Sequence, residues 1–229
     1  MTKSLRSLIA PHTPALVAAF VLLAAGLTGC ASNAAAAKPS RVSDADFARL
    51  AEGASKPVDE ARLALADARD ELGRAQLGVV NDQHEGAFAR SDQAAASAGL
   101  SRADAETQVG KDSNEPGQKQ MAAADTRAAQ QDKGAADAHL AYSKKLAASR
   151  AAQVTAAERK VDLMTEKVYA AKLQALVDAG VPAAGKYDQA AALERVAGAQ
   201  RALDVATAHA AEASRATAEA QARWQPPGK

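Results

Sequence analysis

Apolar residues, alternately large and small, recur in alternating steps of three and four positions, and this spacing constrains the fold more than any other feature. Such steps keep the residues on one face of an α-helix, as in the heptad seam of packed helices. Charged residues between them form the opposite, solvated face. The first series therefore predicts a long helix that packs along a narrow line, and it contains Val58, Ala61, Leu65, Ala68, Leu72, Ala75 and Val79.

Composition excludes a compact globule with a deep core. Hydrophobic residues make up 48% of the 229-residue chain, but aromatic residues make up only 3%, and alanine is the main apolar type. Alanine is the best helix former, yet it buries little apolar surface. We therefore expect an all-α fold, either a long antiparallel helical hairpin or a three-helix coiled-coil bundle.

Capping residues and turn formers divide the helical body. Ser43 followed by Asp46 has the spacing of a capping box, which predicts a short helix ending near residue 50 or 52. Pro57 suits the first turn of a long helix that runs to about residue 108. The pattern weakens after Val80, but helix is expected to continue. The stretch 110–117 contains two glycines and a proline and predicts a turn.

A second long helix is expected over residues 118–179, and its clearest heptad stretch contains Val154, Ala157, Val161, Met164, Val168 and Ala171. Gly180 and Pro182 form a stop signal. Asp188 can cap a third helix that has the following residues on one face: Ala192, Val196, Ala199, Leu203, Ala206, Ala210, Ala213, Thr217, Ala220 and Trp224.

The N-terminus has the features of a secretory signal. Lys3 and Arg6 precede an apolar run at residues 15–26, and no acidic residue occurs before it. This run is shorter than the roughly 17–25 apolar residues that a permanent membrane helix needs. A basic start followed by a short apolar stretch and small residues is typical of an export signal that is removed.

The residues after this run narrow the class. Leu27-Thr28-Gly29-Cys30 resembles the lipobox of bacterial lipoproteins. The resemblance implies cleavage between Gly29 and Cys30, a diacylglyceryl group on the Cys30 thiol, and acylation of its amine by a fatty acid such as palmitate. Cys30 is the single cysteine, so no intramolecular disulfide can form.

The same resemblance implies a location. Two or three acyl chains hold a protein firmly on a membrane, whereas one holds it only marginally. In lipoproteins, an aspartate after the cysteine often retains the product at the inner membrane. Ala31 and Ser32 follow the cysteine here, which favours the outer membrane and a body that faces the periplasm.

No motif predicts an enzyme, a cofactor or a metal site. His84, His139 and His209 are spread over the three expected long helices, and we expect them to face solvent. The chain has no paired cysteines, no Gly-x-Ser-x-Gly elbow and no glycine-rich phosphate loop. Removing residues 1–29 changes the formal charge from +1 to −1, because only Lys3 and Arg6 are lost, and no basic face indicates nucleic acid.

The few aromatic residues allow two interpretations. Such side chains are enriched on partner surfaces, but they also fill the wider parts of thin helical seams or close the ends of a bundle. We favour the second interpretation for Tyr142, Tyr169, Tyr187 and Trp224.

These features predict four segments: a lipoprotein signal at 1–29, a lipidated tether with a short helix at 30–56, a helical body at 57–224, and an unstructured tail at 225–229.

The helical body resembles alanine-rich coiled-coil lipoproteins of the bacterial envelope, including the shorter murein lipoprotein. That protein is linked to peptidoglycan through a C-terminal lysine. This chain also ends in a lysine, Lys229, but the preceding Gln-Pro-Pro-Gly departs from that family's ending.

The predicted role is structural: a scaffold that is held at the membrane by lipid and contacts an envelope protein or another copy, without a small-molecule substrate. The alternative is an accessory subunit of a trans-envelope efflux or secretion complex, with the helical hairpin as its docking element.

Overall fold

The computed structural model describes residues 38, 41–48, 50, 55–112 and 115–224. The described part is all-α, as predicted, and contains no strand. Its elements are the short helix α1 (Asp44–Phe47), the long helices α2 (Lys56–Lys111) and α3 (Pro116–Asp178), the 3₁₀ helix η1 (Pro182–Lys186) and the helix α4 (Gln189–Arg223). The lipobox and the 225–229 tail lie outside the described residues.

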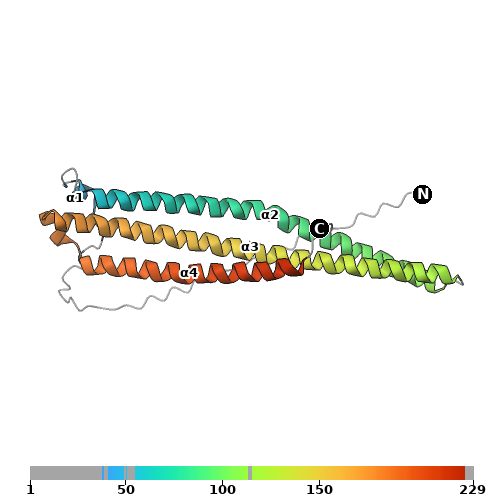
Figure 1. The fold of residues 1–229 in the computed structure, drawn as a ribbon. Helices are drawn as coiled ribbons and strands as arrows, with labels where there is room; N and C mark the ends of the chain where they lie inside the picture. Colours follow the sequence, from blue (N-terminus) through green and yellow to red (C-terminus); the bar gives the residue numbers. More distant parts are fainter. Residues whose placement is uncertain (1–37, 39–40, 49, 51–54, 113–114, 225–229) are drawn as a thin grey trace, which may run out of the picture. The chain divides into compact units, whose positions relative to one another are not determined.

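Helix α3 is the central element of the described part, because it packs against both α2 and α4 (Figure 1). Glu71 of α2, Ala157 of α3 and Leu203 of α4 line one shared hollow, so the three helices form a bundle at that level. Helix α4 ends at Arg223, and Trp224 stacks on His139 of α3. Beyond that point α2 and α3 continue as a two-helix hairpin (Figure 1), so each of the two predicted architectures describes one part of the molecule.

The predicted contact lines are confirmed. All seven residues of the first series and all ten of the last are buried or half-buried. On α2 the line continues without a break in the same three-four steps, and we call the whole line from Val58 to Gly110 the α2 seam. The added members are Asp82, Gly86, Ala89, Gln93, Ala96, Leu100, Ala103, Thr107 and Gly110.

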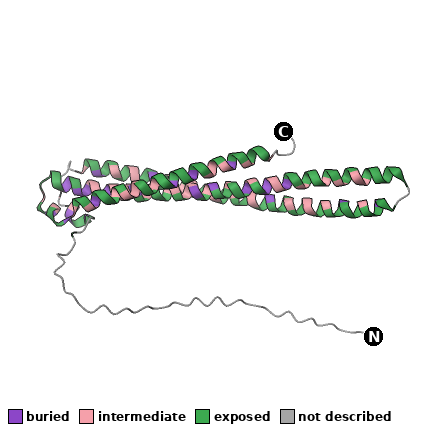
Figure 2. Cartoon of the chain, turned by 90° about the horizontal axis from the view of Figure 1, so that it is seen from below, coloured by how far each residue is buried: buried purple, intermediate pink, exposed green. Residues whose placement is uncertain are grey.

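The apolar pattern weakens after Val80, but the packing of α2 against α3 does not weaken there. Hydrophobicity fades there because polar residues and glycines occupy seam positions, but the geometry of contact persists. In Figure 2 the buried and half-buried residues run along the helices as narrow lines between exposed ones.

The turn between α2 and α3 is shorter than predicted, because Gly110 and Gly117 both lie within helices. Gly110 occupies a seam position, where an added Cβ would come 3.4 Å from the Cβ of Ala122. An alanine would fit there with ordinary van der Waals contact, so this glycine lies at the contact between the two helices and does not form the turn. Pro116 starts α3 at the position where proline costs no helical hydrogen bond.

The end of α3 follows the predicted stop signal. Gly180 has a φ of 63°, the left-handed conformation that glycine adopts without steric cost. The amide of Val181 donates to the carbonyl of Leu176 at 3.0 Å, and the amide of Gly180 donates to that of Val177 at 3.0 Å. These two bonds form a Schellman motif, which satisfies carbonyls at the helix end. The following η1 was not predicted.

Polar pairs join the helices along the seams. Between α2 and α3, the hydroxyls of Thr107 and Thr126 lie 2.8 Å apart, and Lys160 donates to Glu71 at 2.6 Å. Between α3 and α4, the hydroxyls of Ser149 and Ser214 lie 3.1 Å apart. No buried side-chain polar atom in the described ranges lacks a hydrogen-bond partner. Small and polar side chains therefore occupy many positions along the seams, and the buried polar atoms among them all form hydrogen bonds.

Enlarging a seam alanine should separate the helices. Ala68 is fully buried, and Ala66 on the same helix is exposed. We expect Ala68→Leu to lower the free energy of unfolding by about 1–3 kcal/mol, because the extra volume has no space to occupy. Ala66→Leu is the matched control and should change it by less than about 0.5 kcal/mol. Urea unfolding followed by circular dichroism measures both, and equal effects would show that Ala68 does not set the helix separation.

Candidate functional site

The segment Val42–Phe47 packs on the C-terminal end of α3 and on the connection to α4, and we call this contact the N-terminal joint. Val42 is 3% exposed and belongs to a hydrophobic cluster with Leu173, Leu176, Tyr187 and Ala192. Phe47 and Leu50 pack against the same cluster. Leucines and an aromatic ring bury far more area than the alanines of the seams. The joint therefore fixes the start of the described chain to the body.

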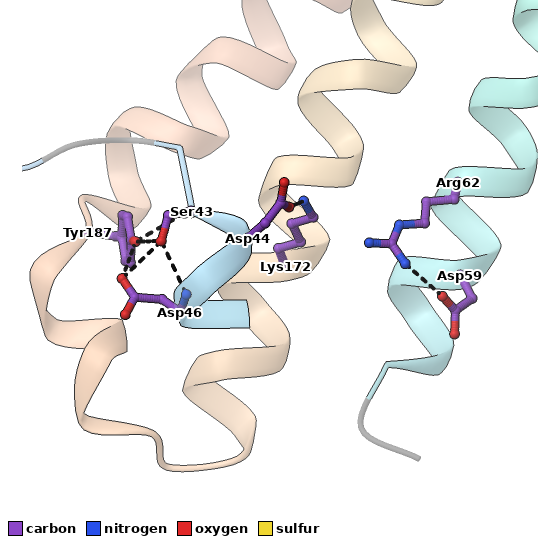
Figure 3. Close-up of polar contacts among 7 residues, drawn as sticks. All are labelled: Ser43, Asp44, Asp46, Asp59, Arg62, Lys172 and Tyr187. Atoms are coloured by element: carbon purple, nitrogen blue, oxygen red, sulfur yellow. Dashed lines mark hydrogen bonds and ion pairs between the residues drawn. The ribbon is translucent and has the colours of Figure 1, made fainter. Parts of the chain in front are cut away.

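The hydroxyl of Tyr187 is the polar centre of the N-terminal joint (Figure 3). It donates to Asp46 Oδ2 at 2.6 Å and accepts from the amide of Ser43 at 3.1 Å. Ser43 caps α1, because its Oγ accepts from the amide of Asp46 at 3.2 Å. The predicted capping pair Ser43 and Asp46 is thus confirmed, and the same two residues also bind Tyr187.

A buried lysine forms the second polar contact of the N-terminal joint. Lys172 on α3 is 6% exposed, and its Nζ donates to Asp44 Oδ1 at 2.6 Å (Figure 3). The Nζ atom also lies 5.6 Å from the ring centres of Phe47 and Tyr169. The hydrogen bond from Lys172, and then its charge, lower the pKa of Asp44 below its ordinary value. The carboxylate therefore stays ionised and compensates a buried ammonium group.

Arg41 extends the joint toward the preceding chain. Its guanidinium pairs with Glu166 of α3 and lies 5.1 Å from the ring centre of Tyr169. The hydrogen bond from Arg41 to Glu166, with the charge of that carboxylate, raises the pKa of Arg41. Glu166 also lies 3.8 Å from Arg195 of α4, so one carboxylate connects three segments of the chain.

A second cluster forms where α4 ends. The ring of Trp224 stacks on His139 at a centroid distance of 4.3 Å and on Tyr142 at 5.0 Å. His139 Nε2 lies 2.7 Å from Glu85 and its Nδ1 lies 3.0 Å from Asp92, both on α2. This cluster ties the end of α4 to the α2–α3 hairpin.

The prediction that all three histidines face solvent is wrong for His139, which is 8% exposed. His84 and His209 are exposed, as predicted. A polar ring can be buried at position 139 because a carboxylate meets each nitrogen and an aromatic ring covers one face. The sequence gives no sign of this, because Glu85 and Asp92 lie 54 and 47 residues away and the register between helices decides which residues meet.

The two carboxylates around His139 contact different nitrogens of the ring, so the three side chains do not converge on one point. A metal ion needs three or four converging ligands. Among the described residues, no group of three histidine, cysteine or acidic side chains could hold a metal ion.

The four aromatic residues for which we predict this role are buried or half-buried, whereas Phe88 on α2 is 64% exposed. Tyr187 is buried in the N-terminal joint, and Tyr142, Tyr169 and Trp224 are half-buried. They occur at the two ends of α4, where the bundle begins and ends. They therefore close the three-helix part of the molecule.

The predicted modification site, Gly29-Cys30, lies outside the described residues. Within the described ranges, no helix combines the length and apolarity that a membrane crossing requires. Comparison of the chain with protein-family models, curated proteins and solved structures found no match.

Removing the Tyr187 hydroxyl tests the N-terminal joint. We expect Tyr187→Phe to lower the free energy of unfolding by about 1–3 kcal/mol, because the buried Asp46 carboxylate loses a hydrogen-bond donor and the amide of Ser43 loses an acceptor. Amide hydrogen exchange of residues 42–48 should also accelerate. Tyr142→Phe is the matched control, since its hydroxyl forms no hydrogen bond to another described residue, and it should change stability by less than about 0.5 kcal/mol. Unchanged exchange in Tyr187→Phe would contradict this role.

Replacing Trp224 tests the second cluster. We expect Trp224→Leu to accelerate amide exchange in the last two turns of α4, because stacked rings contribute about 0.5–1.5 kcal/mol beyond the area they bury. Exchange near the joint should not change. A uniform acceleration along α4 would instead indicate that the whole helix depends on this residue.

Proposed function

We propose that this chain is a lipid-anchored scaffold of the bacterial envelope, whose helical body faces the periplasm and contacts other proteins. The observation that carries the proposal is the match of Leu27-Thr28-Gly29-Cys30 to a lipobox directly after a short apolar run. No enzymatic activity is part of the proposal.

The N-terminal joint supports this role, because it connects a short tether to a rigid body. Eleven residues, 31–41, separate Cys30 from Val42. At 3.3–3.6 Å per residue they span at most about 40 Å. Acyl chains on Cys30 would therefore hold the joint within about 40 Å of the membrane surface. The contacts of Val42 then pass this restraint to α3, and those of Ser43 and Asp46 pass it to Tyr187 in the connection to α4.

The body offers long exposed faces for protein contact. Helix α3 contains 63 residues, which corresponds to about 95 Å at 1.5 Å per residue. Most side chains away from the seams are exposed, and these include large apolar ones such as Leu63, Leu77 and Phe88 on α2. A scaffold needs exposed surface and length more than it needs a pocket, and the helical body has exposed surface and length.

One observation favours the alternative role, an accessory subunit of a trans-envelope efflux or secretion complex. Val109 and Met121, near the turn between α2 and α3, are 74% and 69% exposed. Apolar residues at a hairpin tip suit a docking element. Crosslinking from these two positions separates the roles: one stoichiometric machine component supports the accessory subunit, and crosslinks between copies alone support the scaffold.

The anchor is tested by intact-mass spectrometry of protein purified from membranes, with Cys30→Ala as the control. We expect a mass equal to residues 30–229 plus a diacylglyceryl group and one amide-linked acyl chain. The Cys30→Ala variant should retain residues 1–29 and carry no lipid, because the thiol is the acceptor. An unacylated wild-type protein, or one that retains residues 1–29, would overturn the proposal.

A further inference from the structure

A groove runs along the two-helix part of the molecule, between α2 and α3, and we call it the distal groove. Two hollows form it, and they share Ala95, Ala96 and Asp132. Small residues line both walls: Ala95, Ala96, Gly99 and Ala103 on α2, and Ala128, Ala129, Ala135 and Ala136 on α3. Such walls allow the backbone of a third helix to approach closely.

The distal groove begins where α4 ends. Trp224, the residue after the last turn of α4, lines one of the two hollows together with His139. The groove therefore continues the line of contact between α4 and α3. Along the bundle, α4 presents alanines such as Ala206 and Ala210 to its neighbours. A helix in the groove would extend this established packing toward the hairpin tip.

The charge of the distal groove indicates which kind of partner helix would bind there. Four acidic residues line it, Asp92, Glu106, Asp125 and Asp132, together with Arg102 and His139. His139 Nδ1 lies 3.0 Å from Asp92. Arg102 is already paired with Glu106 at 2.8 Å. Asp125 and Asp132 form no ion pair with another residue in the described part of the chain. Two such acidic grooves would repel each other face to face, whereas a basic helix would be attracted.

We propose that the distal groove binds a helix of a partner protein, with small residues facing the groove and lysine or arginine residues along its edges. This inference rests on the proposed scaffold function and adds the place and the chemistry of one contact. The continuity with α4 specifies a helix, the alanine walls specify small residues, and the acidic edge specifies a basic partner.

Binding can be measured by fluorescence anisotropy with two labelled probe peptides and the purified protein in detergent, whether or not it is acylated. Both peptides have 21 residues, with alanine at heptad seam positions. One carries lysine at the flanking positions and the other carries glutamate. We expect the lysine peptide to bind at least tenfold more tightly than the glutamate peptide, because only the former complements Asp125 and Asp132.

Gly99→Leu should weaken binding of the lysine peptide at least tenfold, because the new side chain fills the groove. An added Cβ at Gly99 meets nothing within 4 Å, so the fold tolerates the change. Gly73→Leu is the matched control on the same helix, since Gly73 also has open space and does not line the groove. It should leave the affinity within twofold.

Equal affinity for both peptides, no binding, or an unaffected Gly99→Leu variant would overturn the proposal. A dimer in analytical ultracentrifugation that Gly99→Leu dissociates would also overturn it, by assigning the groove to a second copy. Peptide binding does not depend on acylation. A failure here therefore leaves the anchor to be judged by the mass measurement, and a missing anchor does not alter this result.

Discussion

An alanine seam determines how closely two helices approach, but it does not determine their register. One alanine resembles the next, so a shift of seven residues would preserve most contacts. The polar pairs remove this ambiguity: Thr107 meets Thr126, and Gln93 donates to Asp137 at 3.0 Å. A shifted register would leave these half-buried groups without partners, which costs free energy. The rest of the molecule depends on this division, in which small residues set the spacing and polar residues set the alignment.

Large apolar side chains are concentrated at one end of the body. Leu173 and Leu176 are at most 2% exposed and lie in the N-terminal joint, whereas the distal hairpin has Ala103 and Gly110 among its buried positions. Because buried area scales with side-chain size, stability per turn decreases toward the tip. The end that receives the tether is therefore the most firmly packed, and the hairpin beyond α4 opens more readily.

Local signals in the sequence predicted the elements well. Ser43, Gly180 and Asp188 mark helix ends through hydrogen bonds within a few residues, so their roles are visible without the fold. The burial of His139 and the pairing of Lys172 with Asp44 were not predictable, because each joins segments that only the register brings together. The α2 seam beyond Val80 was missed for another reason: Asp82 and Gln93 are polar, and a hydrophobic pattern does not count them.

The position of the N-terminal joint has a mechanical consequence. Tension applied to the chain before Val42 reaches α3 through Lys172 and the connection to α4 through Tyr187. It reaches α2 only through the chain that follows α1, and only after the joint has been pulled off α3. The contacts of the joint would thus protect the start of α2 from tension on the preceding chain.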